Sequence, residues 1–574
     1  MKKIIPLLFL SCFCHFISPA QITKFETSKG TQTPTYNEVI LWWQKFDQQY
    51  SEVKMLTKGM TDAGKPLYLV VISADKDFNF ASLHKKNKRI ILINNGIHPG
   101  EPDGIDASML LARDIVTRKE KLPDNIVLAI IPVYNIGGAL NRSKNYRVDQ
   151  NGPEEFGFRG NARNYDLNRD FIKNDSRNAQ SFAKIFHEVD PDVFLDNHVS
   201  NGADYQHIMT LIASQHNKLG GPMGQFMNEE FEPGMYSLMK EKGYDLIPYV
   251  NSFGDTPENG WPEFWDSPRY SSGYASLWHT FGFISETHML KPYDKRVMAT
   301  YALMKSFIEF TNQHSASIKK LREETKNAVK TQKEFTASWK LDTTKKSERI
   351  YKGFTSGRKP SEISGLPRLF YDRSKPYEIK VPFYNFYQPE KMIQKPMAYI
   401  IPQGWWPVID LLKLNGVKMI QLKNDSAIDV EVYKIENYQS STRPYEGHHP
   451  NSRVEVSTST QKIYFRKGDY FIAMNQEANR FLMEVLEPQM EDSYFTWNFF
   501  DPILSQKEGF SSYVFEETAT AYLKEHPEIK KQLEDKRNSD SVFAKSASAQ
   551  LNFVFQHSPY YEPDHLRYPV FRVK

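Results

Sequence analysis

Three side chains in this sequence are of the types that bind a metal ion together. His98 and Glu101 lie three residues apart in the stretch NGIHPGEPDG, and His198 ends the stretch DNH at residues 196–198. Zn²⁺ accepts imidazole nitrogen and carboxylate oxygen in one site, and catalytic zinc sites leave a fourth position to water. A water bound in this way becomes a nucleophile near neutral pH. By itself a His-x-x-Glu pair is weak evidence, and a surface pair without metal is the alternative interpretation.

The neighbouring residues predict that these side chains meet at one edge of a sheet. The apolar run RIILIN at residues 89–94 is typical of a buried strand, and the loop with His98 and Glu101 follows it directly. The apolar residues before DNH predict a second strand, so His198 also comes at the carboxyl end of a strand. In α/β proteins, ligand-binding groups gather in the loops at this edge.

The pattern over residues 21–334 alternates strands and helices. Near-continuous apolar runs predict further strands at residues 67–74, 126–133, 207–213 and 281–286. Apolar residues at three- and four-residue spacing predict helices at residues 35–50, 102–119, 176–188, 220–242 and 294–333. We therefore predict an α/β fold in which a mixed, mostly parallel sheet is flanked by helices.

Four pieces of the sequence, taken in order, are similar to those of a known family. They are His98-x-x-Glu101, FRGNARNYDLNRDF at 158–171, DNH at 196–198 and FISE at 283–286. Together they resemble the zinc metallocarboxypeptidase family, of the carboxypeptidase A type, and the resemblance covers residues 30–320. It implies a carboxypeptidase-like fold and one Zn²⁺ per chain, held by His98, Glu101 and His198.

The resemblance also implies roles for residues in the second and fourth pieces. Glu286 would act as the general base for the zinc-activated water, and a strand-end Glu paired with a nearby cation is the alternative. Arg159 would polarise the scissile carbonyl, while Asn168 and Arg169 would bind the terminal carboxylate of the substrate. Arginine suits a carboxylate because it presents a planar fork of donors, although hydrogen bonds to loop carbonyls are the alternative.

Two further assignments stay open between alternatives. A tyrosine caps the substrate in this family, and Tyr270 and Tyr274 are both candidates. Tyr270 is slightly favoured because it lies farther upstream of Glu286. Asp196 either orients His198 through a hydrogen bond or caps a turn at the end of the strand.

The first residues of the chain have the pattern of an export signal. A basic start, an apolar run and small residues before Gln21 predict a signal peptide at residues 1–20 and a periplasmic or extracellular protein. A lipoprotein signal using Cys12 is the less favoured alternative. Both cysteines, Cys12 and Cys14, fall inside this segment, so we predict a mature chain without disulfides or cysteine nucleophiles. No later run has the length of a membrane span. A net charge of +4 without long basic runs gives no reason to expect nucleic-acid binding.

The composition and hydrophobic pattern of the sequence change after the predicted catalytic domain at residues 21–334. Residues 335–380 are polar and broken by Gly and Pro, which predicts a linker or a loosely packed connection. Residues 381–574 contain several strand-like segments with helical patterns at 405–416 and 476–488 between them. We predict a smaller α+β or β-sandwich domain there, of unknown role.

The sequence thus predicts a secreted zinc-dependent carboxypeptidase that acts on peptides with a free C-terminal carboxylate. One alternative keeps this chemistry and makes the substrate a cell-wall (murein) peptide, cleaved by an amidase or carboxypeptidase. A zinc deacylase of N-acyl amino acids gives no reason for the Arg- and Asn-rich stretch at 158–171. The last alternative is an inactive peptidase-fold protein that binds peptides or glycans, and the complete ligand set together with Glu286 counts against it. The preferred C-terminal residue and the oligomeric state stay open.

Overall fold

The computed structural model describes residues 21–574, which form two compact units. Unit 1 comprises the residues up to Gln332 together with Ser338–Met392 and Leu414–Gly416. Unit 2 comprises Lys333–Ala337, Ile393–Lys413 and Val417–Lys574. The predicted signal peptide and both cysteines lie outside the described residues. Among the helices of residues 21–574, none combines the length and apolar character that crossing a bilayer requires.

Within the described residues, unit 1 is built around an eight-stranded sheet with the order β1-β2-β4-β3-β7-β11-β8-β9. The strands are β1 (Val53–Met60), β2 (Pro66–Ser73), β3 (Arg89–Asn94), β4 (Ile126–Ile131), β7 (Val193–Ser200), β8 (Met209–Ala213), β9 (Ile247–Pro248) and β11 (Phe281–His288). The four central strands, β4, β3, β7 and β11, are parallel. Strands β1 and β2 pair antiparallel with their neighbours, and β8 is antiparallel to β11 but parallel to β9. Every residue of β3 and β4 is buried, as the apolar runs predicted. The mixed, mostly parallel sheet is therefore confirmed.

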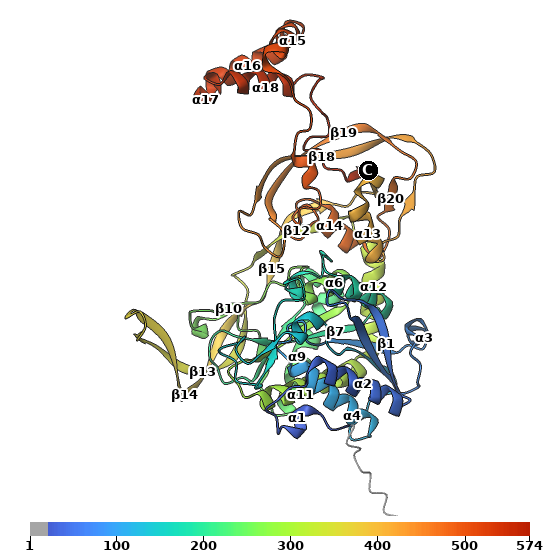
Figure 1. The fold of residues 1–574 in the computed structure, drawn as a ribbon, viewed down its shortest axis with the longest axis vertical. Coiled ribbons are helices and arrows are strands. Elements are labelled where there is room, and N and C mark those ends of the chain that lie inside the picture. Colours follow the sequence, from blue (N-terminus) through green and yellow to red (C-terminus); the bar gives the residue numbers. More distant parts are fainter. Residues whose placement is uncertain (1–20) are drawn as a thin grey trace, which may run out of the picture. The chain divides into compact units, whose positions relative to one another are not determined.

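Helices cover both faces of this sheet (Figure 1). On one face α2 (Tyr36–Gln49), α4 (Asp103–Val116), α9 (Glu232–Glu241) and α11 (Tyr293–Gln313) share a hydrophobic core with β3, β4, β7 and β11. On the other face, Phe182 and Phe186 of α6 (Arg177–Val189) pack against Phe194 of β7. The α-helical segment predicted at 294–333 is two helices, α11 and α12 (Ser315–Thr331), because the chain leaves helical geometry at His314.

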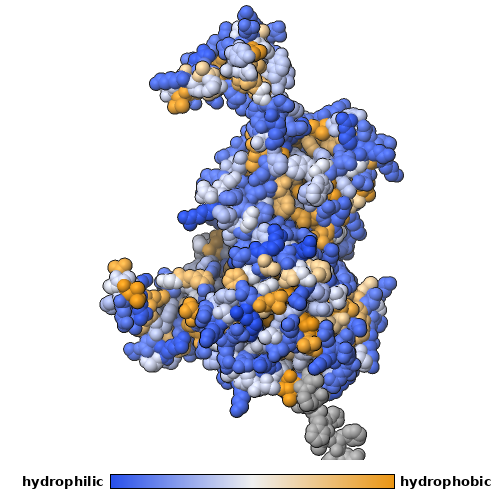
Figure 2. All heavy atoms as spheres, viewed as in Figure 1, coloured by the Kyte–Doolittle hydropathy of each residue, from blue (hydrophilic) through white to orange (hydrophobic). Residues whose placement is uncertain are grey.

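The segment at residues 335–380, which we expected to be a linker, instead forms β-structure. Strands β13 (Ser347–Pro360) and β14 (Pro367–Tyr384) make a long antiparallel hairpin, and its residues belong to unit 1. Much of the hairpin is exposed on both faces, so its strands carry polar residues and lack the apolar alternation of a half-buried strand. The tip exposes Ile363 and Leu366, at 98% and 68%, and apolar residues gather at this end in Figure 2.

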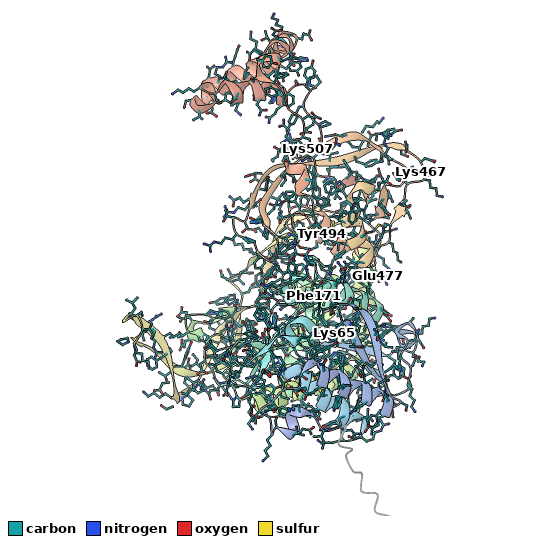
Figure 3. All side chains as sticks on the ribbon, in the orientation of Figure 1. Lys65, Phe171, Lys467, Glu477, Tyr494 and Lys507 are labelled. Carbon is teal, nitrogen blue, oxygen red and sulfur yellow. The ribbon has the colours of Figure 1, made fainter. Side chains whose placement is uncertain are left out.

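Unit 2 is an α+β structure and not a sandwich. Its residues between 398 and 573 contribute one six-stranded sheet with the order β17-β20-β16-β21-β18-β19. The strands are β16 (Ala398–Ile401), β17 (Ile420–Gln421), β18 (Ser426–Ser440), β19 (Asn451–Phe465), β20 (Tyr470–Ala473) and β21 (Phe571–Val573). The two predicted helices are present as α13 (Trp406–Leu414) and α14 (Asn479–Leu486). Tyr494 is buried among the side chains of this unit, whereas Lys467 projects from its surface (Figure 3).

A group of helices precedes the last strand and was not predicted from the sequence. It consists of α15 (Ser512–Glu525), α16 (Pro527–Ser539), α17 (Ser541–Ala544) and α18 (Ala547–Gln556), which share a small core of their own. The chain then returns to the sheet, where β21 pairs with both β16 and β18. The end of the chain therefore completes the middle of this sheet.

Candidate metal and substrate site

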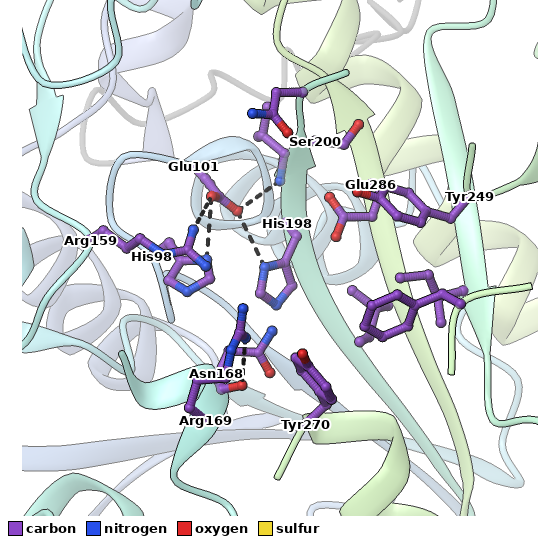
Figure 4. A pocket seen from close by; sticks show the side chains of 15 residues that line it. His98, Glu101, Arg159, Asn168, Arg169, His198, Ser200, Tyr249, Tyr270 and Glu286 are labelled. Atoms are coloured by element: carbon purple, nitrogen blue, oxygen red, sulfur yellow. Dashed lines mark hydrogen bonds and ion pairs between the residues drawn. The ribbon is translucent and has the colours of Figure 1, made fainter. Parts of the chain in front are cut away.

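The structure brings His98, Glu101 and His198 together at the carboxyl edge of the central sheet. One ligand atom from each lies within 4.8 Å of the others, and the three side chains are only 2–3% exposed. Strands β3 and β7 are parallel neighbours, so the loop after β3 and the end of β7 meet at the same edge. Figure 4 shows the three side chains converging. The predicted clustering of these residues is therefore present.

The Nε2 atoms of His98 and His198 are hydrogen-bonded to carboxylates, so the Nδ1 atoms of both imidazoles are available to a metal. His98 Nε2 lies 2.8 Å from Asp166 Oδ1, and His198 Nε2 lies 2.9 Å from Asp196 Oδ2. Each Nδ1 atom faces Glu101, at 3.3 Å from one of its carboxylate oxygens. His98 Nδ1 is buried and makes no hydrogen bond within residues 21–574. Two imidazoles oriented by carboxylates and one further carboxylate fit the ligand set of a zinc ion.

Arg147 supports Glu101, and sequence reasoning missed it. Its Nη1 atom lies 2.7 Å from Glu101 Oε1, and the Val199 N–H donates to Oε2 at 2.8 Å. Burial by itself raises the pKa of Glu101, but the surrounding positive charge, with Arg147 first, outweighs it and holds this pKa well below its usual range. Glu101 is therefore ionised, as a metal ligand must be. A lone arginine in a loop carries no spacing signal that would have revealed it.

Asp166 links the metal cluster to Arg159. Its Oδ2 atom accepts hydrogen bonds from Arg159 Nε and Nη2, at 3.0 and 2.9 Å, while Oδ1 contacts His98. Burial opposes ionisation, but His98 and the arginines hold the pKa of Asp166 well below its usual range. Arg159 Nη1 also approaches Glu101 Oε1 at 3.5 Å. Asp166 was missed as an individual residue, although it lies in the Arg- and Asn-rich stretch that the sequence singled out.

Asn168, Arg169 and Tyr270 form one end of the pocket (Figure 4). The short helix η2 (Leu167–Arg169) places Asn168 and Arg169 side by side, and the Arg169 guanidinium lies 4.5 Å from the centre of the Tyr270 ring. The other tyrosine candidate, Tyr274, is fully buried, does not line this pocket, and its hydroxyl contacts His187. The structure thus places Tyr270, and not Tyr274, beside the arginine.

Glu286 lies on β11, opposite His198 on the neighbouring strand β7. Shielding from bulk water raises the pKa of Glu286 to about 8, and the negative charge of Glu101 adds to this, while His198 and Arg159 oppose it. A carboxyl group with such a pKa can exchange a proton near neutral pH. Tyr249, another residue that the sequence did not reveal, lies close to Glu286 in the same pocket (Figure 4).

The pocket has a volume of about 220 Å³ and joins a polar and an apolar part. All eight sequence-predicted site residues line it, namely His98, Glu101, Arg159, Asn168, Arg169, His198, Tyr270 and Glu286. Its apolar lining includes Ile212, Phe264 and Ile284. The site therefore combines a metal-binding cluster, a candidate base and paired donors for an anion beside apolar walls.

Comparison with known proteins identifies a family for part of the chain. Residues 39–211 match the family model of the zinc carboxypeptidases. Carboxypeptidase 2 of the fungus Trichophyton rubrum is 20% identical over 500 residues, which cover 83% of this chain and 86% of the fungal protein. Carboxypeptidase 2 of Trichophyton tonsurans is 20% identical over 511 residues.

Solved structures of carboxypeptidases also resemble this chain. A metallo-carboxypeptidase from Burkholderia cenocepacia is 14% identical, with a TM-score of 0.37, covering 48% of this chain and 69% of that protein. Carboxypeptidase A from Helicoverpa armigera is 14% identical with a TM-score of 0.36, covering 50% of this chain and 74% of that one.

The matched segment contains most of the site described above. His98, Glu101, Arg159 and His198 fall inside residues 39–211, as does the Asn168–Arg169 pair, whereas Tyr270 and Glu286 lie beyond it. The resemblance that the sequence motifs indicated is thereby confirmed at the level of the family. Residues 39–211 of this chain thus match the zinc carboxypeptidase family.

Proposed function

We propose that this protein is a zinc-dependent metallocarboxypeptidase that hydrolyses the C-terminal peptide bond of its substrates. One observation carries the proposal. A buried His-Glu-His cluster, with two Nδ1 atoms facing one carboxylate, shares a pocket of about 220 Å³ with the paired donors Asn168 and Arg169. The first group suits a metal, and the second suits the free carboxylate that marks the end of a peptide.

The residues around the metal position divide the chemistry between them. A zinc ion held by His98, Glu101 and His198 would lower the pKa of a bound water and so supply the nucleophile. Glu286, which lies opposite His198 on the neighbouring strand and lines the same pocket, would take a proton from this water and pass it to the leaving amine. Arg159, held by Asp166, donates to the carbonyl oxygen as negative charge develops on it.

The other end of the pocket selects the substrate. Arg169 and Asn168 bind the terminal carboxylate, and the Tyr270 ring beside Arg169 covers it. The side chain of the terminal residue lies against the apolar walls formed by Ile212, Phe264 and Ile284, so apolar C-terminal residues are preferred over charged ones. From the sequence of residues 1–20 we also propose that the protein is exported.

The experiment pairs each peptide with its own C-terminal amide. We expect the purified protein to contain about one zinc per chain, to release C-terminal Leu or Phe from the free peptide, and to lose this activity with a chelator. The amide should not be cleaved, because it lacks the charge that Arg169 binds. Equal cleavage of both peptides would overturn the carboxylate assignment. Activity on muropeptides alone would favour the cell-wall alternative, and zinc binding without any hydrolysis would favour the inactive binding protein.

A further inference from the structure

A second cavity adjoins the proposed active site, and we call it the hairpin cavity. Its volume is about 290 Å³, and its walls include Asn201, Phe253 and Leu290 together with Leu369 and Tyr371 of β14. Asn201 lines both this cavity and the metal pocket, so the two are neighbours. The hairpin formed by β13 and β14, where the sequence predicts a linker, therefore supplies part of the surroundings of the site.

The hairpin cavity lies on the side of the metal cluster away from the carboxylate-binding residues. In Figure 4, Ser200 is on one side of His198 and Glu101, while Arg169 and Tyr270 are on the opposite side. Strand β7 leads from His198 to Ser200, and Asn201 follows directly. A peptide whose carboxylate is held at Arg169 and whose scissile bond is at the metal is therefore directed toward Ser200 and Asn201.

The base of the hairpin is firmly attached to the loops beside the site. Tyr351 and Phe383 of the hairpin share a buried cluster with Tyr205 and Trp261. The amide of Gln206 donates from Nε2 to two hairpin carbonyls, at 2.9 and 3.0 Å, and its backbone N–H donates to a third at 2.8 Å. These bonds hold one wall of the cavity in place before any substrate arrives, which reduces the entropy cost of binding.

The walls of the hairpin cavity are suited to apolar side chains in an extended peptide. Leu369 and Tyr371 are partly exposed within the hairpin, and Phe253 is 55% exposed. Covering such surfaces with an apolar side chain removes them from water. The metal pocket, at about 220 Å³, is smaller than the roughly 300–1,000 Å³ of pockets that enclose whole small molecules. It holds only the end of a peptide, so further contacts must come from outside it.

We propose that the hairpin cavity is a binding subsite for the residues of a peptide substrate upstream of the scissile bond. This inference rests on the proposed carboxypeptidase function and extends it to the substrate class: peptides longer than a dipeptide, with apolar residues two to four positions before the cleaved bond. Binding energy gained there holds the scissile bond against the metal and raises kcat/KM for longer peptides.

The test compares two substrates that end in the same two residues. One is an acyl-blocked dipeptide, and the other is a hexapeptide with Leu and Ala upstream. For the wild-type protein we expect kcat/KM to be at least about tenfold higher for the hexapeptide. Leu369→Ser should lower the hexapeptide-to-dipeptide ratio by about fivefold, the effect of losing one apolar contact. Ile363→Ser, at the fully exposed tip of the same hairpin, is the matched control and should keep the ratio.

The outcomes separate this inference from the proposed function. If neither substrate is cleaved, the carboxypeptidase proposal fails. If the dipeptide is cleaved and the wild-type ratio is near one, the subsite proposal alone fails. Phe253→Ser is a second variant at a residue that lines the same cavity, and it should lower the ratio as Leu369→Ser does. Each variant is first checked for an unchanged melting temperature, and a ratio that neither variant changes would overturn the subsite.

Discussion

At the scale of single residues, hydrogen bonds decide which nitrogen of each imidazole faces the metal. Asp166 and Asp196 accept from the Nε2 atoms of His98 and His198, so both Nδ1 lone pairs remain available. The sequence left two roles open for Asp196, and its 2.9 Å contact with His198 supports the orienting one. Partners of this kind usually change metal affinity by 10–100-fold when they are lost.

Replacing the candidate base separates metal binding from catalysis. Glu286→Gln keeps the shape of the side chain but removes its ability to accept a proton, so we expect kcat to fall by about 10²–10⁴-fold. Zinc content, measured by elemental analysis, should stay near one per chain because Glu286 is not among the three ligands. A variant that stays active would place the base elsewhere, and one that loses zinc would make Glu286 part of the metal site.

At the scale of elements, the close approach of α4 to the strands shapes the site. Gly104 lies in the first turn of α4, just after the loop that carries His98 and Glu101. A Cβ atom at this position would lie 2.4 Å from Asn95 Oδ1 and 2.5 Å from the Cβ of Asn197. Asn197 directly precedes the ligand His198. Any side chain at position 104 would therefore push α4 away from the strand end that carries His198.

A methyl group at this glycine should therefore disturb both stability and the metal site. We expect Gly104→Ala to lower the free energy of unfolding by about 1–3 kcal/mol, as overpacking does, and to weaken zinc binding. Urea denaturation and competition with a chromogenic chelator measure the two effects. Gly404→Ala is the control, because a Cβ there meets no atom within 4 Å. Unchanged zinc affinity in Gly104→Ala would mean that the loop adjusts without moving Glu101.

Short helix α7 (His216–Leu219) contains a histidine that should make folding sensitive to acid. Burial lowers the pKa of His216 to about 4, and its Nε2 atom makes no hydrogen bond within the described residues. Below about pH 6.5 the unfolded chain takes up a proton here that the folded protein does not, so stability is lost as the pH falls toward 4. Above pH 6.5 the neutral His216 costs the folded protein no stability, because the unfolded chain does not take up this proton either.

Replacing this histidine should reduce the acid sensitivity. Between pH 7 and pH 5, we expect wild type to lose about 1–2 kcal/mol more unfolding free energy than His216→Leu. Urea titrations of both proteins at the two pH values give this difference directly. An equal loss in both would show that His216 keeps an ordinary pKa in the folded state.

At the scale of the whole molecule, every residue that lines the metal pocket belongs to unit 1, whereas unit 2 depends on the end of the chain. Arg572 on β21 is buried between Glu431, at 2.8 Å, and Glu487, and it also donates to the Gln394 carbonyl at 2.6 Å. Removing one partner of a buried ion pair leaves an uncompensated charge and is strongly destabilising.

Loss of this arginine should therefore destabilise unit 2 selectively. We expect Arg572→Ala to lower its unfolding free energy by about 3–5 kcal/mol, seen in calorimetry as an earlier transition. Lys574→Ala is the control, because Lys574 also pairs with Glu431 but its side chain is 66% exposed. Below the earlier transition, kcat/KM for the acyl-blocked dipeptide should stay within about twofold of wild type. A proportional loss of activity would show that the two units do not act independently.

The sequence by itself determined the elements whose side chains are buried and the residues that follow them. The apolar runs of β3 and β4 and the spacing in α2 and α4 report burial directly, which is why their bounds were predicted closely. The sequence also predicted that the metal ligands at the strand ends lie close together, since parallel strands bring their carboxyl ends to one edge of the sheet. The motif resemblance then assigned a family to this arrangement.

Only the tertiary structure decided which distant groups support the site. Arg147 reaches Glu101 across 46 residues, and Asp166 joins His98 to Arg159, yet neither contact leaves a periodic signal in the chain. The β13–β14 hairpin was mistaken for a linker because a ribbon exposed on both faces needs no apolar alternation. Local patterns record how much of a segment is buried, and they do not record which partner buries it.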